Sequence, residues 1–363
     1  MTKATTMQAM ADALRVHPTE LTGQPWTSQD AAGAEAHAGL ESIEIALEHY
    51  ELGLDPEIPV RSWPQIQADI DRLVRLHHHV ADYAAMAELA PILIGELHAA
   101  YGRLPQRARD VLIGLINAYS SAMWATKRLG GRGLPALAAR VVQQCAEALD
   151  DAVWLGYAAW TRGQATGALD RTAQYRRLVA AAENLTGKLD SGDALQASGM
   201  LHLSAGWTAG ARGDHDTSAT HFDEASALAA RMDTEVGTWA NLWFGPTNVG
   251  IWRTSLAVDL GEHGHALQVA KTVHPELLPN RRQAEFWSHV GRALVAEKKI
   301  RHKGVHVLLH AEQLAPQRIH KDMLVRETVA GLLRQTRRDA GGRELRGLAW
   351  RMGIAPLRPE SAS

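Results

Sequence analysis

The feature that most constrains the fold is a series of similar helical units from about Ser62 onward. In each unit a segment with helical periodicity leads into a Gly/Asp/His turn, and a second, alanine-rich segment follows, as in residues 211–232 and 260–273. The second segments begin near Ala168, Thr217, His265 and Gly304. The starts are roughly 40 to 50 residues apart, longer than the 34 residues of a regular tetratricopeptide repeat. Because one helical hairpin cannot bury its apolar face alone, this pattern predicts an all-α, tetratricopeptide-like helical-hairpin solenoid with irregular repeats.

Composition agrees with a helical protein that carries no strong charge. Hydrophobic residues make up 46% of the chain and charged residues 21%, which is ordinary globular composition. Alanine and leucine dominate, and both favour helices. The net charge is −2, so any surface for nucleic acid would have to be local. Cys145 is the only cysteine, which predicts a reducing, cytoplasmic location, and we expect no membrane span.

Four regions are expected along the chain. Residues 1–24 contain a short amphipathic helix over 4–15, which a His17–Leu21 turn connects to a second short helix. Residues 25–61 are expected to hold a linker and a first helix over 37–52. Residues 62–354 form the predicted repeat domain, in which 319–353 would be a capping helix pair. Residues 355–363 are expected to be a disordered tail.

Residues 2–23 carry a family resemblance. Met7, Met10, Ala11, Leu14, Val16, Leu21 and Gly23 occupy the apolar and glycine positions of a LxxLAxALxVxxxxLxG pattern. This segment resembles the end of the helix-turn-helix domain of Xre/Cro-repressor-like regulators. The segments 238–253 and 308–334 are similar to the long tetratricopeptide-like region of bacterial Xre-type transcriptional regulators. The resemblance implies a regulator whose intact relatives bind promoter DNA.

The chain departs from that family at its start. In these domains the helices that enter the major groove precede the segment matched here, so no recognition-helix residue is carried over and the DNA-binding residues are unknown. Residues 2–23 contain only Lys3 and Arg15 as cations, which predicts weak, salt-sensitive binding at best. We expect promoter DNA as a partner only when the missing helices are present. A start codon placed too late, a shortened chain and a true loss of DNA binding all remain open explanations.

The segment 238–253 is the sharpest candidate for a ligand or partner site. We expect Trp239 and Trp243, at i and i+4, to share one face of a helix that Gly245–Pro246 interrupts. The candidate contact residues are Trp239, Asn241, Trp243, Phe244, Asn248, Trp252 and Arg253. Trp, Asn and Arg suit a peptide or another amphipathic ligand in a repeat groove. The competing interpretation is that the tryptophans fill the core between helices.

Other polar clusters favour structural interpretations. His302, His306 and His310 share a helical face but would need a carboxylate or another ligand from a neighbouring element to hold a metal, and the sequence fixes none. His77–His79 are consecutive and point in different directions. The arginines at 334–351 are interpreted as the solvated face of a capping pair. We recognise no nucleophile–base, cofactor or metal motif, and therefore predict a protein that is not an enzyme and has neither cofactor nor metal.

The sequence therefore predicts a transcriptional-regulator-type protein whose repeat domain senses a small molecule, a peptide or a protein. The alternative is a protein–protein interaction scaffold with no DNA-binding role. No membrane partner is expected, and formation of a homodimer is left open.

Overall fold

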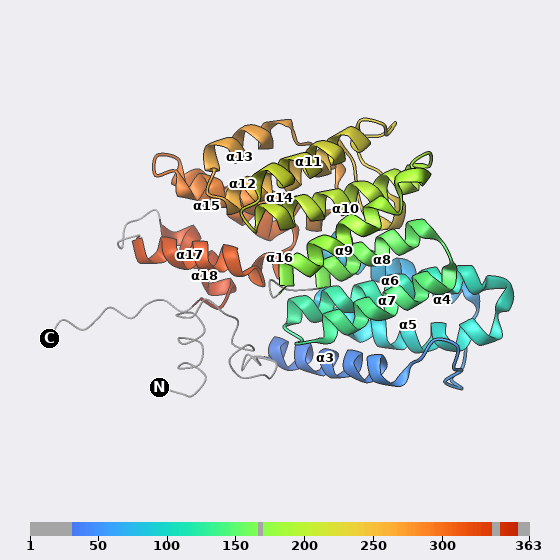
Figure 1. The fold of residues 1–363 in the computed structure, drawn as a ribbon. Coiled ribbons are helices and arrows are strands. Elements are labelled where there is room, and N and C mark those ends of the chain that lie inside the picture. The colour runs from blue at the N-terminus through green and yellow to red at the C-terminus, as the bar shows by residue number, and fades with distance from the viewer. Residues whose placement is uncertain (1–30, 166–169, 336–341, 355–363) are drawn as a thin grey trace. The chain divides into compact units, whose positions relative to one another are not determined.

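All regular secondary structure in the described part of the chain is helical, which confirms the all-α prediction (Figure 1). A computed structural model describes residues 31–165, 170–335 and 342–354, with side chains from Ala38 onward. No strand occurs among these residues, and none of their helices is both long and apolar enough to cross a membrane. The segment 1–24, with the residues of the family resemblance, and the tail 355–363 lie outside the described residues.

The chain divides into two compact units. Unit 1 contains residues up to Arg177 except 78–81, and unit 2 contains 78–81 and the chain from Leu178 onward. The sequence predicted one repeat domain over residues 62–354, whereas the structure divides this range between two units. The elements before the boundary are α3 (Ala31–His49), α4 (Trp63–Arg75), the π-helix η1 (Leu76–Val80), α5 (Tyr83–Arg103), η2 (Pro105–Arg107), α6 (Ala108–Leu129), α7 (Leu134–Leu149) and α8 (Ala152–Ala165); α9 (Arg171–Glu183) spans it.

Unit 2 continues with helical pairs and short 3-10 turns. Its elements are η4 (Thr186–Lys188), α10 (Gly192–Gly210), α11 (His215–Ala229), η5 (Trp239–Asn241), α12 (Pro246–Asp259), α13 (His263–Val269), η6 (Ala270–Thr272), η7 (Pro275–Leu277), α14 (Asn280–Ala296), α15 (Arg301–Leu314), α16 (Pro316–His320), α17 (Met323–Gln335) and α18 (Arg343–Arg351). Three of the predicted second helices begin within three residues of their expected starts, at His215, His263 and Arg301. The fourth expected start, Ala168, lies outside the described residues.

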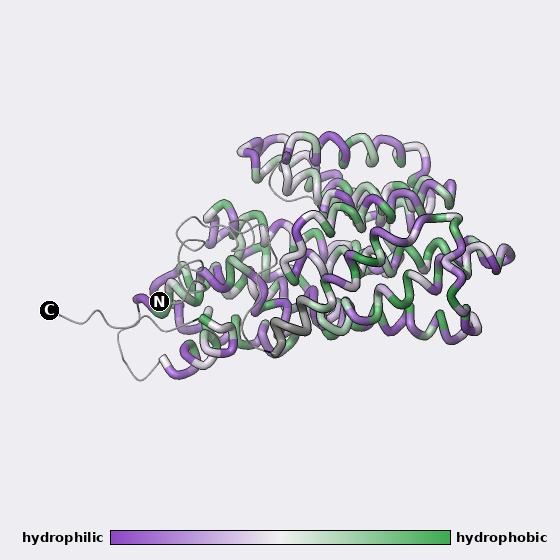
Figure 2. The backbone as a smooth tube through the Cα atoms, turned by 90° about the horizontal axis from the view of Figure 1, so that it is seen from below, coloured by the Kyte–Doolittle hydropathy of each residue, from purple (hydrophilic) through white to green (hydrophobic). Residues whose placement is uncertain are grey.

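Local sequence signals explain where several helices begin. Ser62 and Gln65 form a capping box at the start of α4, whose Ile66, Ile70 and Leu73 share the buried face. Asp82 and Asp214 cap α5 and α11 by accepting hydrogen bonds from backbone N–H groups three residues later. Hydrophobic and hydrophilic residues alternate along the helices of both units (Figure 2). Helix pairing then buries the hydrophobic faces, because α5–α6, α6–α7, α10–α11 and α14–α15 pack closely.

Two expectations about helix boundaries are wrong. The first helix is α3, which begins at Ala31 instead of residue 37 and ends at His49, because the alanine-rich stretch that was expected to be linker favours helix. Gly304 lies inside α15, not at its starting turn. A Cβ on Gly304 would lie 2.8 Å from the carbonyl oxygen of Gly291. This glycine therefore permits close approach of α14 and α15, and does not serve as a helix stop.

The first helices of the pairs in unit 2 run parallel to one another. Gly199 and Gly210, near the middle and the end of α10, face Phe244, just before α12, and Leu256, near its end. Asn248, at the start of α12, contacts Arg282, at the start of α14, and Asp259, at the end of α12, pairs with Arg292. These contacts fix the register of α10, α12 and α14 along their length.

We expect Gly304→Ala to lower the free energy of unfolding by about 2 kcal/mol, because overpacking outweighs the gain in helix propensity. The added Cβ would lie 2.7 Å from both the backbone nitrogen and Cγ2 of Val295. Urea unfolding of the full chain measures the change. Gly264→Ala is the matched control, because a Cβ there meets nothing within 4 Å. Equal stability of the two variants would contradict the packing role of Gly304.

Candidate functional site

The first half of the segment that the sequence singled out, residues 238–245, belongs to an irregular loop of unit 2 between α11 and α12, and residues 246–253 begin α12. The predicted helix over Trp239 and Trp243 is wrong, because only the short η5 turn forms there. Ala240, Asn241 and Trp243 have φ angles of 46°, 56° and 55°. L-residues rarely adopt this left-handed conformation, and each one costs on the order of 1–3 kcal/mol. Contacts with the rest of the unit must therefore hold the loop in place.

Phe244 is the main anchor of the loop. Its side chain is completely buried, and its ring fills the space beside Gly199 of α10, where an added Cβ would lie 2.0 Å from the ring. The N–H of Gly237 donates to the Phe244 carbonyl at 2.7 Å and closes the loop. The Trp239 N–H donates to Oε1 of Gln196 at 3.0 Å. These contacts with α10 and across the loop replace the hydrogen bonds of the helix that the periodicity predicted.

Trp243 contacts a segment that is distant in the sequence. Residues 78–81 belong to unit 2, and His78 accepts a hydrogen bond at Nδ1 from the Trp243 indole N–H at 3.3 Å. The His79 ring meets the same indole edge to face. Burial, followed by the positive charge of Arg281, lowers the pKa of His78 well below its ordinary value. His78 is therefore neutral, which leaves Nδ1 available as an acceptor.

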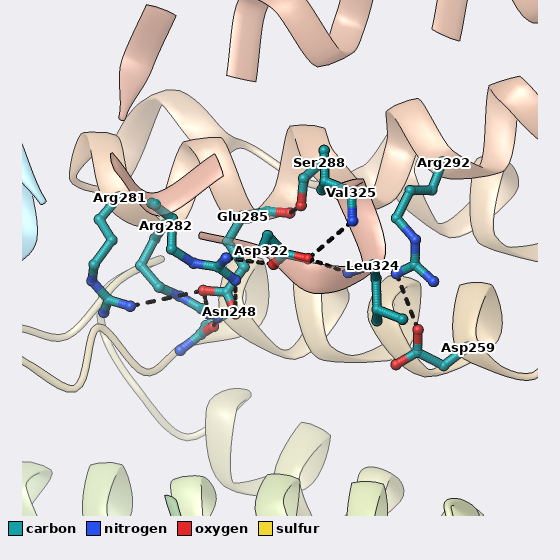
Figure 3. Close-up of polar contacts among 11 residues, drawn as sticks. Asn248, Asp259, Arg281, Arg282, Glu285, Ser288, Arg292, Asp322, Leu324 and Val325 are labelled. Atoms are coloured by element: carbon teal, nitrogen blue, oxygen red, sulfur yellow. Dashed lines mark hydrogen bonds and ion pairs between the residues drawn. The ribbon is translucent and has the colours of Figure 1, made fainter. Parts of the chain in front are cut away.

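Asn248 connects the loop to a buried ion cluster. It is completely buried, and its Nδ2 donates to the Leu242 carbonyl at 3.3 Å. Its Oδ1 accepts a hydrogen bond from Nη2 of Arg282 (Figure 3). Both ends of this amide are thus used within the protein. Asn248 positions the loop and is not available to contact a ligand.

We define the Glu285 cluster as Arg281, Arg282, Glu285, Arg318 and Asp322, which ion pairs connect. It lies beside Asn248, which Arg282 contacts (Figure 3). Glu285 Oε2 lies 2.6 Å from Nη1 of Arg282, and its Oε1 lies 3.7 Å from Nη2 of Arg318. Arg318 also pairs with Asp322 at 2.5 Å. Burial alone would raise the pKa of Glu285, but the charges of Arg282, Arg318 and Arg281 hold it well below the ordinary value. The cluster is ionised and joins α14 to α16.

Within residues 239–243 the side chains of Trp239, Ala240, Asn241 and Trp243 are only partly buried, while Leu242 is buried. The side-chain amide of Asn241 has no hydrogen-bond partner among the described residues. The loop therefore places indole surface and an unused amide at the surface of unit 2. An amide provides two donors and an acceptor, which is the complement of a peptide backbone.

Arg253 and Trp252 are placed differently from the loop residues. Arg253 of α12 pairs with Asp223 of α11 at 2.8 Å and lies over the Phe222 ring. Trp252 is half-buried, and its Nε1 has no hydrogen-bond partner in the described part of the chain. The structure thus brings Trp239, Asn241 and Trp243 together and assigns Phe244 and Asn248 to their support, while Arg253 joins α12 to α11.

Sequence reasoning missed the residues that hold the loop. Arg281, Arg282 and Glu285 do have a local signal, because i, i+3 and i, i+4 pairs of opposite charge lie on one helix face. His78 and Arg318 have no local signal that relates them to residue 243 or 285. Among the described residues, no group of three or more His, Cys, Asp or Glu side chains is placed to hold a metal ion.

Comparison of the chain with models of protein families, with curated proteins and with solved structures finds no match. The class that the structure defines is therefore an all-helical protein of paired helices.

We expect Glu285→Gln to lower the free energy of unfolding by about 3–5 kcal/mol, because it leaves buried arginine charges without their shared carboxylate. Denaturant unfolding at pH 7 measures the loss, and the exposed Glu297→Gln is the control. The pKa of Glu285 is depressed, so its stabilisation is present above the ordinary value of 4.5 and is lost as pH falls through the lower pKa of the folded state. The two proteins should therefore converge in stability in acid. A loss below about 1 kcal/mol at pH 7 would show that the cluster does not hold α14 and α16 together.

Proposed function

We propose that unit 2 senses a peptide or a peptide segment of a protein partner through the loop 239–243, in a transcriptional-regulator-type protein. The observation that carries the proposal is the strained backbone at Ala240, Asn241 and Trp243. Strain of this kind persists only where surrounding contacts impose it, and it is concentrated at ligand sites. Here the contacts of the buried residues Phe244 and Asn248 impose the strained backbone. The strained segment holds the partly buried side chains of Trp239, Asn241 and Trp243 at the surface.

The chemistry of the loop favours a peptide over a small polar ligand. Indole rings supply apolar contact area with few rotatable bonds, and tryptophan is enriched at the centres of binding interfaces. The Asn241 amide supplies both donor and acceptor groups for a peptide backbone. The parallel register of α10, α12 and α14 further supports a tetratricopeptide-like stacking of hairpins, an architecture that binds extended partners along its surface.

The regulator part of the proposal rests on the resemblance of residues 2–23 to the end of an Xre-type helix-turn-helix domain. The alternative is an interaction scaffold without a DNA-binding role. The net charge of −2 and the pairing of Arg61, Arg103 and Arg282 with carboxylates favour this alternative for the described residues. Paired arginines contribute little to a phosphate-binding surface.

The peptide site is tested with peptides selected on the immobilised full chain from a random library. We expect Trp239→Ala and Asn241→Ala each to weaken binding of the selected peptides by about tenfold or more, as for residues central to an interface. Fluorescence polarisation measures the dissociation constants. Trp350→Ala is the matched control, because Trp350 is 80% exposed and lies on α18. Unchanged binding by both loop variants, with an unchanged helical CD spectrum, would rule out the loop as the site.

A gel-shift experiment distinguishes the regulator proposal from the scaffold proposal. It measures promoter DNA binding by the chain and by an N-terminally extended version, at two salt concentrations. The regulator proposal expects binding by the extended version that weakens steeply with salt, because phosphate contacts release counterions. The selected peptide should change that binding. Failure of the extended version to bind DNA with or without peptide would eliminate the regulator and leave the scaffold.

A further inference from the structure

A cavity of about 390 Å³ lies in unit 2, where the ends of α12 and α14 and the starts of α13 and α15 meet one side of α17, and no residue of the loop lines it. Its apolar lining includes Val258 and Leu332, each 4% exposed, and Val295 of α14. Its volume is within the range of pockets that hold small organic ligands. Such pockets combine an apolar wall with a few polar groups that orient the ligand.

The polar lining of this cavity is cationic. Arg292 is neutralised by Asp259 at 3.1 Å. Arg301 donates through Nε to the Val295 carbonyl at 3.2 Å, which positions its guanidinium at the cavity. No carboxylate of the described residues lies within ion-pair distance of Arg301 or of Arg334, which also lines the cavity. Glu327 is the acidic member of the lining and leaves an excess of one positive charge.

His263 adds a second unsatisfied group to the same cavity. The Nδ1 atom of its ring is buried and has no hydrogen-bond partner among the described residues. Buried polar atoms nearly always have a partner, and each exception requires an explanation. A ligand with a polar group in this cavity would supply one.

We propose that the cavity binds an amphipathic monocarboxylate. The carboxylate pairs with the guanidinium groups of Arg301 and Arg334, and the apolar part of the ligand covers Val258, Val295 and Leu332. Guanidinium groups match a carboxylate because they donate two parallel hydrogen bonds to it. The carboxylate of Glu327 disfavours a doubly charged anion such as phosphate, since like charges repel. The carboxylate comes either from a free organic acid or from the C-terminal residue of a peptide, because both present the same chemistry.

Isothermal titration calorimetry of the full chain with octanoate tests the proposal, with octanol as the neutral probe of equal chain length. We expect octanoate to bind, and Arg301→Gln and Arg334→Gln each to weaken it about tenfold, as for loss of a hydrogen bond to a charged group. Arg346→Gln is the matched control, because this exposed arginine of α18 does not line the cavity. Trp239→Ala should leave octanoate binding unchanged, which separates this cavity from the loop.

The source of the carboxylate is determined with trileucine in its free and C-terminally amidated forms. Tighter binding of free trileucine than of octanoate assigns the cavity to peptide C-termini, and the reverse order assigns it to free acids. Both results require that the amidated peptide binds at least tenfold more weakly than the free one. The proposal is overturned if octanol binds as well as octanoate, if octanoate does not bind at millimolar concentration, or if both arginine variants keep wild-type affinity with unchanged CD spectra.

Discussion

The burial of arginine side chains is the constraint on which unit 2 depends. Arg282 is 8% exposed and Arg318 is 3% exposed. Removing a guanidinium from water costs several kcal/mol unless a carboxylate and further hydrogen bonds replace the water. Glu285 lies between these two arginines and contacts both, and Asp322 provides a second carboxylate to Arg318. The start of α14 and helix α16 meet at this point, and their contact compensates the buried charges.

The strained loop follows from this constraint through Asn248. Arg282 fixes the oxygen of the Asn248 amide, so its nitrogen points to the Leu242 carbonyl. The neighbouring Phe244 is fixed independently, by the space that Gly199 leaves on α10. Two anchors on adjacent parts of a short loop leave few backbone conformations for the residues between them. The positive φ angle of Trp243 is the consequence, and the energy it costs is recovered in the burial of Phe244.

Helices could be predicted from the sequence because their signals are local. The starts of α11 and α13 follow from Asp214, from glycine-containing turns and from apolar periodicity, and the structure places them within two residues of expectation. The loop could not be predicted in this way. Trp239 and Trp243 have helical spacing, and only the contacts of Phe244 with a helix some 40 residues earlier in the chain show that the spacing is misleading.

Glycine and histidine show the same limit of local reasoning. Gly304 has the local appearance of a turn, yet its role is set by the backbone of a neighbouring helix. The His77–His79 run has poor geometry for a metal site, which sequence reasoning noted, but the partner of His78 is an indole 165 residues away. Contacts between residues so distant in sequence require the folded arrangement, and they are the contacts that build the candidate site.

Polar contacts at both ends of α14 determine its register against α12. Asn248–Arg282 and Asp259–Arg292 span about 15 Å along each helix at 1.5 Å per residue. Because the two spans match, sliding α14 by one helical turn along α12 would break both contacts and bury unpaired charge. An interface of apolar side chains alone would tolerate such a shift better. This register places the aromatic loop beside the first half of α14 and the cationic cavity beside its last turns. One helix thus contacts both the loop for which we propose peptide binding and the cavity for which we propose carboxylate binding.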